Sequence, residues 1–468
     1  MISISGKIWE ESKIDKNKIE KIKQDFNLSE IVSKIIIRRK FTEEEIYSLN
    51  NKIEISNIFI NNKDYKNSVD ILIKSIENKE IICILGDYDV DGSVATSFIV
   101  RFLNEIKHPN FFYIPDRQTD GYGATKKLFL KLIKKKPKLV IMLDCGSTSI
   151  EAIKFLNNNN IKSIIIDHHE ISKPYPLATS IINPKKNNGY NEYSYMCATT
   201  LTYFFIELVK KKIKSKINLK DYLIYVLLAT VCDVMPIRKY NRLIAIEALK
   251  KIDISNLKAL NEICEIKKIK NKISINDLGY LIGPILNAGG RLGKSNYATE
   301  LLSSVDNDFI KKRSNELIIL NEKRKIIENN ILKDIDFNKI EKKNDSIIII
   351  NNYNINEGLI GIIAARLKEH FNKPSIVITD SNNLLKGSAR STPNFNIGSI
   401  IKNALDKKII INGGGHSMAA GFTLKKDMLN SFKEFLNISY KKNINKNTNI
   451  FYYEAKLSSI AINKKFYD

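Results

Sequence analysis

The stretch IICILGDYDVDG, from Ile81 to Gly92, decides the fold of this chain. It begins with an unbroken apolar run, Ile81 to Leu85, and then places aspartates at three alternate positions. Such a run, ended by glycine and acidic residues, is typical of a strand that is buried on both faces of a parallel sheet. The runs Leu139 to Leu143 and Ser163 to Ile166 repeat the pattern, with helical stretches between them. The sequence therefore predicts an α/β domain whose parallel sheet is flanked by helices.

The composition favours a nucleic-acid partner. Of the 468 residues, 43% are apolar and 27% are charged, which is globular composition with length enough for two or three domains. The formal net charge of +24 favours a polyanion, with nucleic acid ahead of an anionic membrane surface. The many Ile, Lys and Asn residues also fit simple compositional drift, so charge alone leaves both interpretations open.

Targeting and cysteine signals favour the cytoplasm. No apolar run approaches the roughly 20 residues that cross a bilayer, and the N-terminus becomes charged too early for a secretory signal. The five cysteines are scattered and never spaced as C-x-x-C, which argues against a disulfide framework or a zinc knuckle. We expect a cytoplasmic protein without a membrane partner.

The periodicity divides the chain into regions. Thr42, followed by three glutamates, predicts a helix start. Apolar residues at helical spacing from Asp308 to Ile335 predict a long connecting helix, and the run Ser346 to Ile350 predicts the first strand of a second domain. We expect an N-terminal helical segment (1–45), a catalytic domain (46–305), a connecting helix (306–342), a smaller α/β domain (343–430) and a C-terminal tail (431–468).

Acidic clusters follow four of the apolar runs. In a parallel sheet these positions meet at the carboxyl edge, where several carboxylates repel one another unless cations neutralise them. Oxygen ligands with one or two imidazoles suit Mn²⁺ or Mg²⁺, and two such ions would clamp a phosphodiester and activate water. An EF-hand is excluded, because its twelfth loop position is Phe98. The clusters are GDYDVDG (Asp87, Asp89 and Asp91), LDCGST (Asp144), IDHHE (Asp167, His168 and His169) and CDVMP (Asp233, at the end of an apolar helix or strand).

These four clusters resemble the motifs of DHH-superfamily phosphoesterases. Other segments are similar to RecJ-type exonucleases of that superfamily, and the second domain resembles the DHHA1 module. The similarity extends from about Arg38 to Leu424. The RecJ-like segments are IPDRQTDGYGA (Ile114 to Ala124), INP (Ile182 to Pro184) and NAGGRLGKS (Asn287 to Ser295), and the DHHA1-like ones are EGLIGIIAARL (Glu357 to Leu367), KGSARS (Lys386 to Ser391) and NGGGHSMAAGF (Asn412 to Phe422).

The resemblance implies roles for the clustered residues. Asp144 would bridge two ions, and Asp87 would be a further ligand or support a bound water. His169 would contact the scissile phosphate or protonate the leaving oxygen, while Asp167 would orient the histidines. The implied metal ligands are Asp89, Asp91, Asp144, His168 and Asp233.

The resemblance also implies residues that bind substrate. Backbone amides of the triple glycine would approach a phosphate, with a histidine beside them. Arginine suits phosphate because its guanidinium binds two oxygens at once. The implied substrate-binding residues are Gly413, Gly414, Gly415 and His416 at the glycine strand, Ser388 and Arg390 along the nucleotide chain, and Arg117 and Arg291 at a 5′-terminal phosphate.

The sequence departs from the family pattern in two places. Ile355-Asn356 stands where members often carry Trp-His. An OB-fold is absent or truncated, and the segment Ile450 to Ile460 is either its first strands or a strand that returns to the core. Because an OB-fold supplies a stacking platform, we expect weaker strand binding and lower processivity than in longer members.

The resemblance implies a 5′→3′ single-stranded DNA exonuclease that releases 5′-mononucleotides in DNA repair and recombination. Single-stranded DNA would be its substrate, threaded between two domains, and a single-strand-binding protein or a helicase is a candidate partner. Two alternatives stay open. One is a DHH-family phosphodiesterase for oligonucleotides or cyclic dinucleotides, or a bisphosphonucleotide phosphatase, which would prefer a dinucleotide to a long strand. The other is a non-catalytic nucleic-acid-binding scaffold, which would bind no Mn²⁺.

Overall fold

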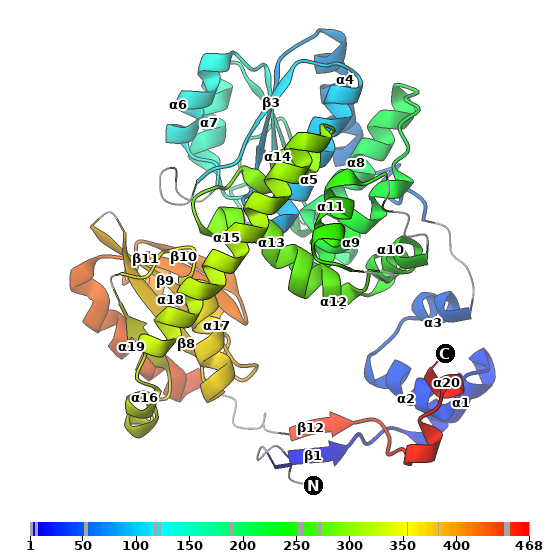
Figure 1. Cartoon of the computed structure of the whole chain (residues 1–468), viewed down its shortest axis with the longest axis vertical. Helices are drawn as coiled ribbons and strands as arrows, with labels where there is room; N and C mark the ends of the chain where they lie inside the picture. Colours follow the sequence, from blue (N-terminus) through cyan, green and yellow to red (C-terminus); the bar gives the residue numbers. More distant parts are fainter. Residues whose placement is uncertain are drawn as a thin grey trace. The chain divides into compact units, whose positions relative to one another are not determined.

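The structure is a computed structural model. Contacts divide the chain into two compact units, each with a five-stranded sheet of its own. The predicted α/β class with a smaller second α/β domain is confirmed (Figure 1). The larger unit is Ile55–Asp334 with Glu357–Leu359, and the smaller is Met1–Glu54, Ile335–Asn356 and Ile360–Asp468. The structure describes residues 3–4, 8–50, 55–116, 120, 123–186, 191–250, 254, 256–269, 273–352, 354–381, 383–443 and 450–467.

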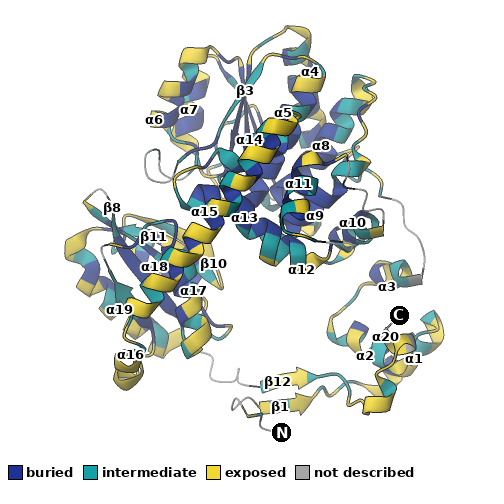
Figure 2. Ribbon diagram, in the orientation of Figure 1, coloured by how far each residue is buried: buried dark blue, intermediate teal, exposed yellow. Residues whose placement is uncertain are grey.

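The larger unit is built around a parallel sheet in the order β3-β2-β4-β5-β6. Ile84 and Ile141 face one apolar core, whereas Leu85 and Met142 face another. Because both faces are covered, every residue of β2 and β4 is buried, which explains their unbroken apolar runs (Figure 2). The strands are β2 (Ile82–Gly86), β3 (Asn110–Tyr113), β4 (Leu139–Leu143), β5 (Lys162–Ile166) and β6 (Ser180–Ile182).

Helices cover both faces of this sheet. α6 (Lys126–Leu132) and α7 (Ile150–Asn158) pack on one face, and α4 (Lys63–Glu77), α5 (Val90–Glu105) and α8 (Ala198–Lys212) pack on the other. In the strand register, Gly86 pairs with Leu143 and Leu143 with Ile166. The carboxyl ends of β2, β4 and β5 are therefore level, so the acidic residues that follow them emerge at one edge.

The rest of the larger unit is helical. The predicted long helix is present as α15, which has 28 residues. None of the helices in the described ranges combines the length and the apolarity that crossing a bilayer requires. The helices are α9 (Leu223–Cys232), α10 (Lys239–Lys250), α11 (Lys258–Ile266), α12 (Ile275–Asp277), the π-helix η5 (Leu278–Ile282), α13 (Gly283–Arg291), α14 (Tyr297–Ser303) and α15 (Asn307–Asp334).

The smaller unit contains a mixed sheet in the order β10-β11-β9-β8-β7. Only the β7–β8 pair is parallel among its described strands. Its core gathers apolar residues of the sheet, α18 and α19. The elements are α16 (Phe337–Lys343), β7 (Ile348–Asn351), α17 (Ile360–Phe371), β8 (Ser375–Ser381), β9 (Leu384–Arg390), α18 (Ile397–Asp406), β10 (Asn412–His416), β11 (Ala419–Leu424) and α19 (Leu429–Asn443).

The two ends of the described chain pair with each other. β12 (Ile450–Tyr453), in the segment with two predicted alternatives, forms a two-stranded parallel sheet with β1 (Ile8–Glu11) and joins neither larger sheet. The predicted helix start is confirmed, because the Glu45 amide donates to Thr42 Oγ1 at 3.3 Å and the Thr42 amide donates to Glu45 Oε2 at 3.0 Å. The helices here are α1 (Lys16–Phe26), α2 (Glu30–Arg38), α3 (Glu43–Asn50) and α20 (Lys464–Tyr467).

Candidate metal centre

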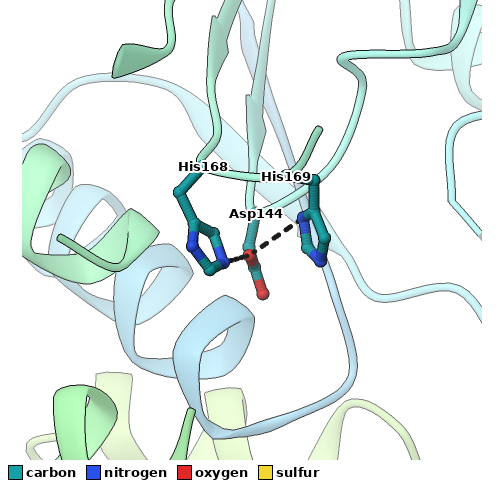
Figure 3. Close-up of side chains that lie close together, drawn as sticks. All are labelled: Asp144, His168 and His169. Atoms are coloured by element: carbon teal, nitrogen blue, oxygen red, sulfur yellow. Dashed lines mark ion pairs between the residues drawn. The ribbon is translucent and has the colours of Figure 1, made fainter. Parts of the chain in front are cut away.

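The acidic clusters meet at the carboxyl edge of the parallel sheet. Nε2 of His168 lies 3.3 Å from Asp144 Oδ1, 3.4 Å from Asp233 Oδ2 and 3.8 Å from Asp91 Oδ2. Nδ1 of His169 lies 3.6 Å from Asp144 Oδ1 (Figure 3). Three groups of potential ligand atoms result, each within 4.8 Å: Asp144, His168 and His169; Asp91, His168 and Asp233; and Asp87, Asp89 and Asp144.

Asp144 occupies an unusual turn after β4. Its φ of +58° lies in the left-handed region, which non-glycine residues rarely adopt, and its amide donates to Ile166 O at 3.0 Å. Gly146, at φ +106°, completes the same turn. Backbone strain of this kind persists where the surroundings fix a side chain for function. The turn directs the Asp144 carboxylate between His168 and His169 (Figure 3).

The start of α5 positions the first cluster. Asp89 caps this helix and accepts the Gly92 amide at 3.0 Å. A Cβ on Gly92 would lie 2.6 Å from both the backbone N and O of Asp87, so only glycine fits there. Asp91 accepts from the first amides of α8, Ala198 N at 2.7 Å and Thr199 N at 2.8 Å. This carboxylate therefore joins the start of α5 to α8.

Asp167 organises the histidine loop. Its Oδ1 accepts from the His168 amide at 2.8 Å, the His169 amide at 3.1 Å and His169 Nδ1 at 2.8 Å, and its Oδ2 accepts from the Ser147 amide at 3.1 Å. Burial raises the pKa of Asp167, but the hydrogen bond and charge of His169 outweigh it and leave that pKa below the usual value. Burial lowers the pKa of His169, yet Asp167 raises it to about 9. His169 therefore holds a proton at neutral pH.

Asn183 is a site residue that the assignment of individual roles missed. It is fully buried, and its Nδ2 donates to Ser147 Oγ at 2.8 Å and to His169 O at 3.0 Å. Asn183 thus links the turn after β4 to the histidine loop after β5. Its signal in the sequence is the INP segment, Ile182 to Pro184, for which the resemblance implies no individual role.

The electrostatics of the cluster fit a divalent cation. Burial and then the neighbouring carboxylates raise the pKa of Asp144 well above its usual value, raise that of Asp89, and raise that of Asp233 to about 8. Among the described residues, Asp144 Oδ1, Asp233 Oδ2 and both ring nitrogens of His168 are buried without a hydrogen-bond partner. Buried polar atoms rarely stay unsatisfied. Hard cations that take oxygen and imidazole ligands would satisfy these atoms and neutralise the charge.

The predicted substrate residues of the smaller unit lie on its sheet. Ser388 and Arg390 are on β9, and Arg390 Nη1 donates to Ser388 Oγ at 3.1 Å. A Cβ on Gly361 in α17 would lie 3.2 Å from that oxygen and 3.1 Å from Arg390 Nη2. His416 ends the edge strand β10 and is exposed. Ser388 and Arg390 therefore face the start of α17.

The three glycines of β10 have different surroundings. A Cβ on Gly413 would lie 2.8 Å from side-chain carbons of Ile401 and Ile410 in the core. Gly415 adopts φ +156°, and its Cβ would lie 2.3 Å from Ala419 O. A Cβ on Gly414 would meet no atom of the described structure within 4 Å. Packing therefore explains two of the glycines, and open space lies beside the third.

The remaining predicted contacts are the two arginines. Arg117 lies outside the described residues. Arg291 ends α13, and its Nη1 donates to Gly358 O at 3.4 Å. A Cβ on the preceding Gly290 would lie 2.7 Å from Tyr88 O, so this helix end packs directly on the loop that contains Asp87 and Asp89.

Comparison with known proteins identifies both domains. The model of the DHH family N-terminal domain matches residues 81–230, and the model of the DHHA1 domain matches residues 344–442. The single-stranded-DNA-specific exonuclease RecJ of Bacillus subtilis is 28% identical over 442 residues, covering 92% of this chain and 54% of that protein. RecJ of Haemophilus influenzae is 27% identical over 391 residues, covering 79% and 68%. The chain thus spans about half to two thirds of the length of these relatives.

Solved RecJ structures share the fold. RecJ of Thermus thermophilus in complex with Mn²⁺ superposes with a TM-score of 0.81 at 20% identity, covering 96% of this chain and 65% of that one. Another exonuclease RecJ bound to manganese gives 0.69 at 23% identity, covering 83% and 97%. With a DHH domain followed by a DHHA1 domain, and with RecJ proteins similar to it in both sequence and fold, the chain belongs to the RecJ-type DHH–DHHA1 proteins.

Proposed function

We propose that this protein is a metal-dependent 5′→3′ exonuclease that hydrolyses single-stranded DNA and releases 5′-mononucleotides. The carboxylates and imidazoles clustered at one edge of the parallel sheet are the main support, because several of their buried atoms have no hydrogen-bond partner among the described residues. The RecJ relatives are named single-stranded-DNA-specific exonucleases, which supports the substrate.

Two Mn²⁺ or Mg²⁺ ions are the proposed cofactors. Asp89, Asp91, Asp144, His168 and Asp233 would hold them, with Asp87 as a further ligand. Asp144 contributes to two of the three ligand groups, which supports a bridging role. When bound, divalent cations supply the positive charge that polarises a phosphodiester and lowers the pKa of water. Solved RecJ structures in complex with Mn²⁺ and with Mg²⁺ support the choice of ions.

His169 and Asp167 are the proposed proton-handling pair. The hydrogen bond to Asp167 keeps a proton on His169 Nδ1, so Nε2 of the same ring points away from the carboxylate. His169 would contact the scissile phosphate through Nε2 and give its proton to the departing 3′ oxygen. Asp167 would act through His169, because its own oxygens accept four hydrogen bonds from the protein.

The DHHA1 domain is the proposed binding surface for the nucleotide chain. Ser388, Arg390 and His416 would contact phosphates, and the open space beside Gly414 would let the strand approach the backbone of β10. Gly413 and Gly415 would shape the β-strand β10. In the larger unit, Arg291 would grip the 5′-terminal phosphate together with Arg117. Because these contacts are to phosphates, binding should weaken steeply with salt.

DNA repair and recombination are the proposed setting. The net charge of +24 supports a polyanionic substrate, and the protein partner we propose is a single-strand-binding protein or a helicase. A cytoplasmic location is proposed with them.

Digestion of 5′-labelled and 3′-labelled single strands with Mn²⁺, beside the Asp144→Ala variant, tests the proposal. Release of mononucleotides from the 5′ end by the wild type alone is the expected result. Long strands that stay intact while dinucleotides disappear would assign the protein to short substrates instead. Cleavage of neither would favour a binding scaffold.

A further inference from the structure

Two highly exposed side chains, one at the end of α9 and one in the turn that packs on it, have no part in the chemistry above. Val234 directly follows the predicted ligand Asp233 and is 86% exposed, and Tyr280 lies in the π-helix η5 and is 85% exposed. Scattered apolar residues on a surface need no explanation. These two differ, because unusual backbone geometry holds each of them and because their segments pack on each other.

Val234 is held in a strained conformation. Its φ of +55° lies in the left-handed region, which is exceptional for a β-branched residue. Its amide donates to Val231 O at 3.1 Å, which ends α9 in a tight turn. Neighbouring Cα atoms are about 3.8 Å apart, so this side chain leaves the backbone at the rim of the metal centre.

Tyr280 is held by a π-helix. Such single turns are rare and are frequent at functional sites, where the extra residue changes the direction of a side chain. Here the turn lies between α12 and α13, and its flanking residues Leu278 and Ile282 are buried while Tyr280 is exposed. The buried pair anchors the turn and leaves the phenol ring on the surface.

Close packing joins the two segments. Cys232 Sγ donates to Leu278 O at 3.8 Å. A Cβ on Gly283 would lie 2.3 Å from the same sulfur, and a Cβ on Gly279 would lie 3.0 Å from Val231 Cγ1. The last turn of α9, which leads into Asp233 and Val234, therefore rests directly on the π-helix.

From this geometry we infer that Tyr280, with Val234 beside the ligand turn, is a stacking site for a base of the single strand. The inference rests on the proposed function and extends it to the bases. An uncharged aromatic ring exposed on a rigid turn stacks on any base, which suits an enzyme that does not read sequence. Lys239 and the preceding Arg238 follow Val234 within five residues and supply positive charge for the adjoining phosphates.

A protein partner fits this surface less well than the strand does. Val234 adjoins a predicted metal ligand, so a protein docked over it would obstruct the centre during turnover. The substrate chain has to lie at that rim while it is cut. An extended nucleotide chain, which occupies the rim without closing it, is therefore the occupant that this position favours.

Equilibrium binding of a labelled 20-nucleotide single strand, followed by fluorescence anisotropy, tests the stacking site. All variants are made in an Asp144→Ala background so that the strand is not consumed. Tyr280→Leu should raise Kd on the order of tenfold, while Tyr280→Phe, which keeps the ring, should stay within about twofold. Leu177→Ala is the matched control, because Leu177 is also highly exposed but precedes β6 at the opposite edge of the sheet.

Strands with one abasic site, moved along the sequence, make the test specific. An abasic site at one position of the strand should weaken binding to the protein that retains Tyr280 on the order of tenfold. The same abasic site should leave binding to the Tyr280→Leu protein nearly unchanged. The inference is overturned if Tyr280→Leu binds every strand as its parent does, or if the abasic penalty persists without the ring. Loss of self-association in Tyr280→Leu with unchanged strand binding would also overturn it. Failure of the wild type to hydrolyse DNA would refute the proposed function and leave this binding result intact.

Discussion

The two units hold their predicted functional residues in opposite ways. In the larger unit, Asp144 and His168 are buried and lie on tight loops after strands. In the smaller unit, Gly414 and His416 are exposed on the edge strand β10. Buried carboxylates are costly without a counter-charge, whereas an exposed glycine strand lets a ligand approach at little cost. Substitution of a buried carboxylate in the larger unit should therefore lower activity and raise the stability of the metal-free protein. Substitution of a glycine in β10 should change either strand binding or stability, but not both.

Replacement of Asp144 should give the largest effect. Asp144→Asn keeps the side-chain volume and tolerates a φ of +58°, but it removes the charge that is proposed to hold the ions. Because metal assistance contributes several kcal/mol, kcat should fall by about a thousandfold or more. The metal-free variant should melt at a higher temperature than the metal-free wild type, since burial and neighbouring carboxylates raise the pKa of Asp144.

Single-strand digestion and thermal melting in EDTA check both expectations. An active Asp144→Asn protein would contradict the proposed centre. A lower melting temperature would contradict the account of its electrostatics.

The metal-free protein should lose stability as pH rises from 6.5 to 8.5. The pKa of Asp233 is raised to about 8 in the folded protein, against about 3.9 in an unfolded chain. The protonated Asp233 therefore contributes its full stabilisation below about pH 3.9, and this stabilisation is lost as the pH rises through about 8. The pKa of His169, raised to about 9, acts in the same direction. Burial lowers the pKa of His168 to about 4, so the titration of His168 changes the stability only below about pH 6.5.

Melting temperatures with EDTA and with Mn²⁺ across this range measure the effect. The increase that Mn²⁺ produces should grow with pH, because a cation replaces the proton on Asp233. Asp233→Asn is the control and should flatten the slope of the metal-free protein. A rise in the melting temperature of the metal-free protein with pH would contradict the prediction.

Asp167→Asn should have an intermediate effect. An amide at this position weakens the hydrogen bond that keeps the His169 pKa high, so kcat should fall on the order of 10- to 100-fold and the alkaline limb of its pH profile should move to lower pH. A double variant with His169→Ala is the control. It should be no slower than His169→Ala alone, because Asp167 is proposed to act through that ring. Additive losses would assign Asp167 a separate role.

The sequence predicted the sheet and the clustering because both depend on local patterns. The run Leu139 to Leu143 is β4 in full, and the long helix expected from Asp308 to Ile335 is α15 within one residue at each end. The acidic residues after β2, β4 and β5 meet because parallel strands end at one edge, which follows from topology, whereas Asp233 joins them from the C-terminal end of the helix α9. The ligand and substrate roles of individual residues stay predictions.

Features that depend on distant contacts were not predictable in this way. Asp91 accepts amides more than one hundred positions away, at Ala198 and Thr199. β1 pairs with β12 across almost the whole chain. The π-helix at Leu278–Ile282 packs against Cys232, a contact that no local periodicity records. Each results from tertiary packing that overrides local preference.

The smallest expected effects come from the glycine strand, where a matched pair tests the contrast between the units. Gly413→Ala inserts a methyl group 2.8 Å from Ile401 and Ile410 side-chain carbons, so it should cost about 1–3 kcal/mol of stability and leave strand binding unchanged. Gly414→Ala meets no neighbour in the described structure, so it should keep the melting temperature and weaken binding only a few-fold by narrowing the approach to β10. Urea unfolding and anisotropy on both variants measure this separation. If Gly414→Ala binds the strand as the wild type does, the open space beside Gly414 does not receive the substrate, and the DHHA1 contacts must come from Ser388, Arg390 and His416.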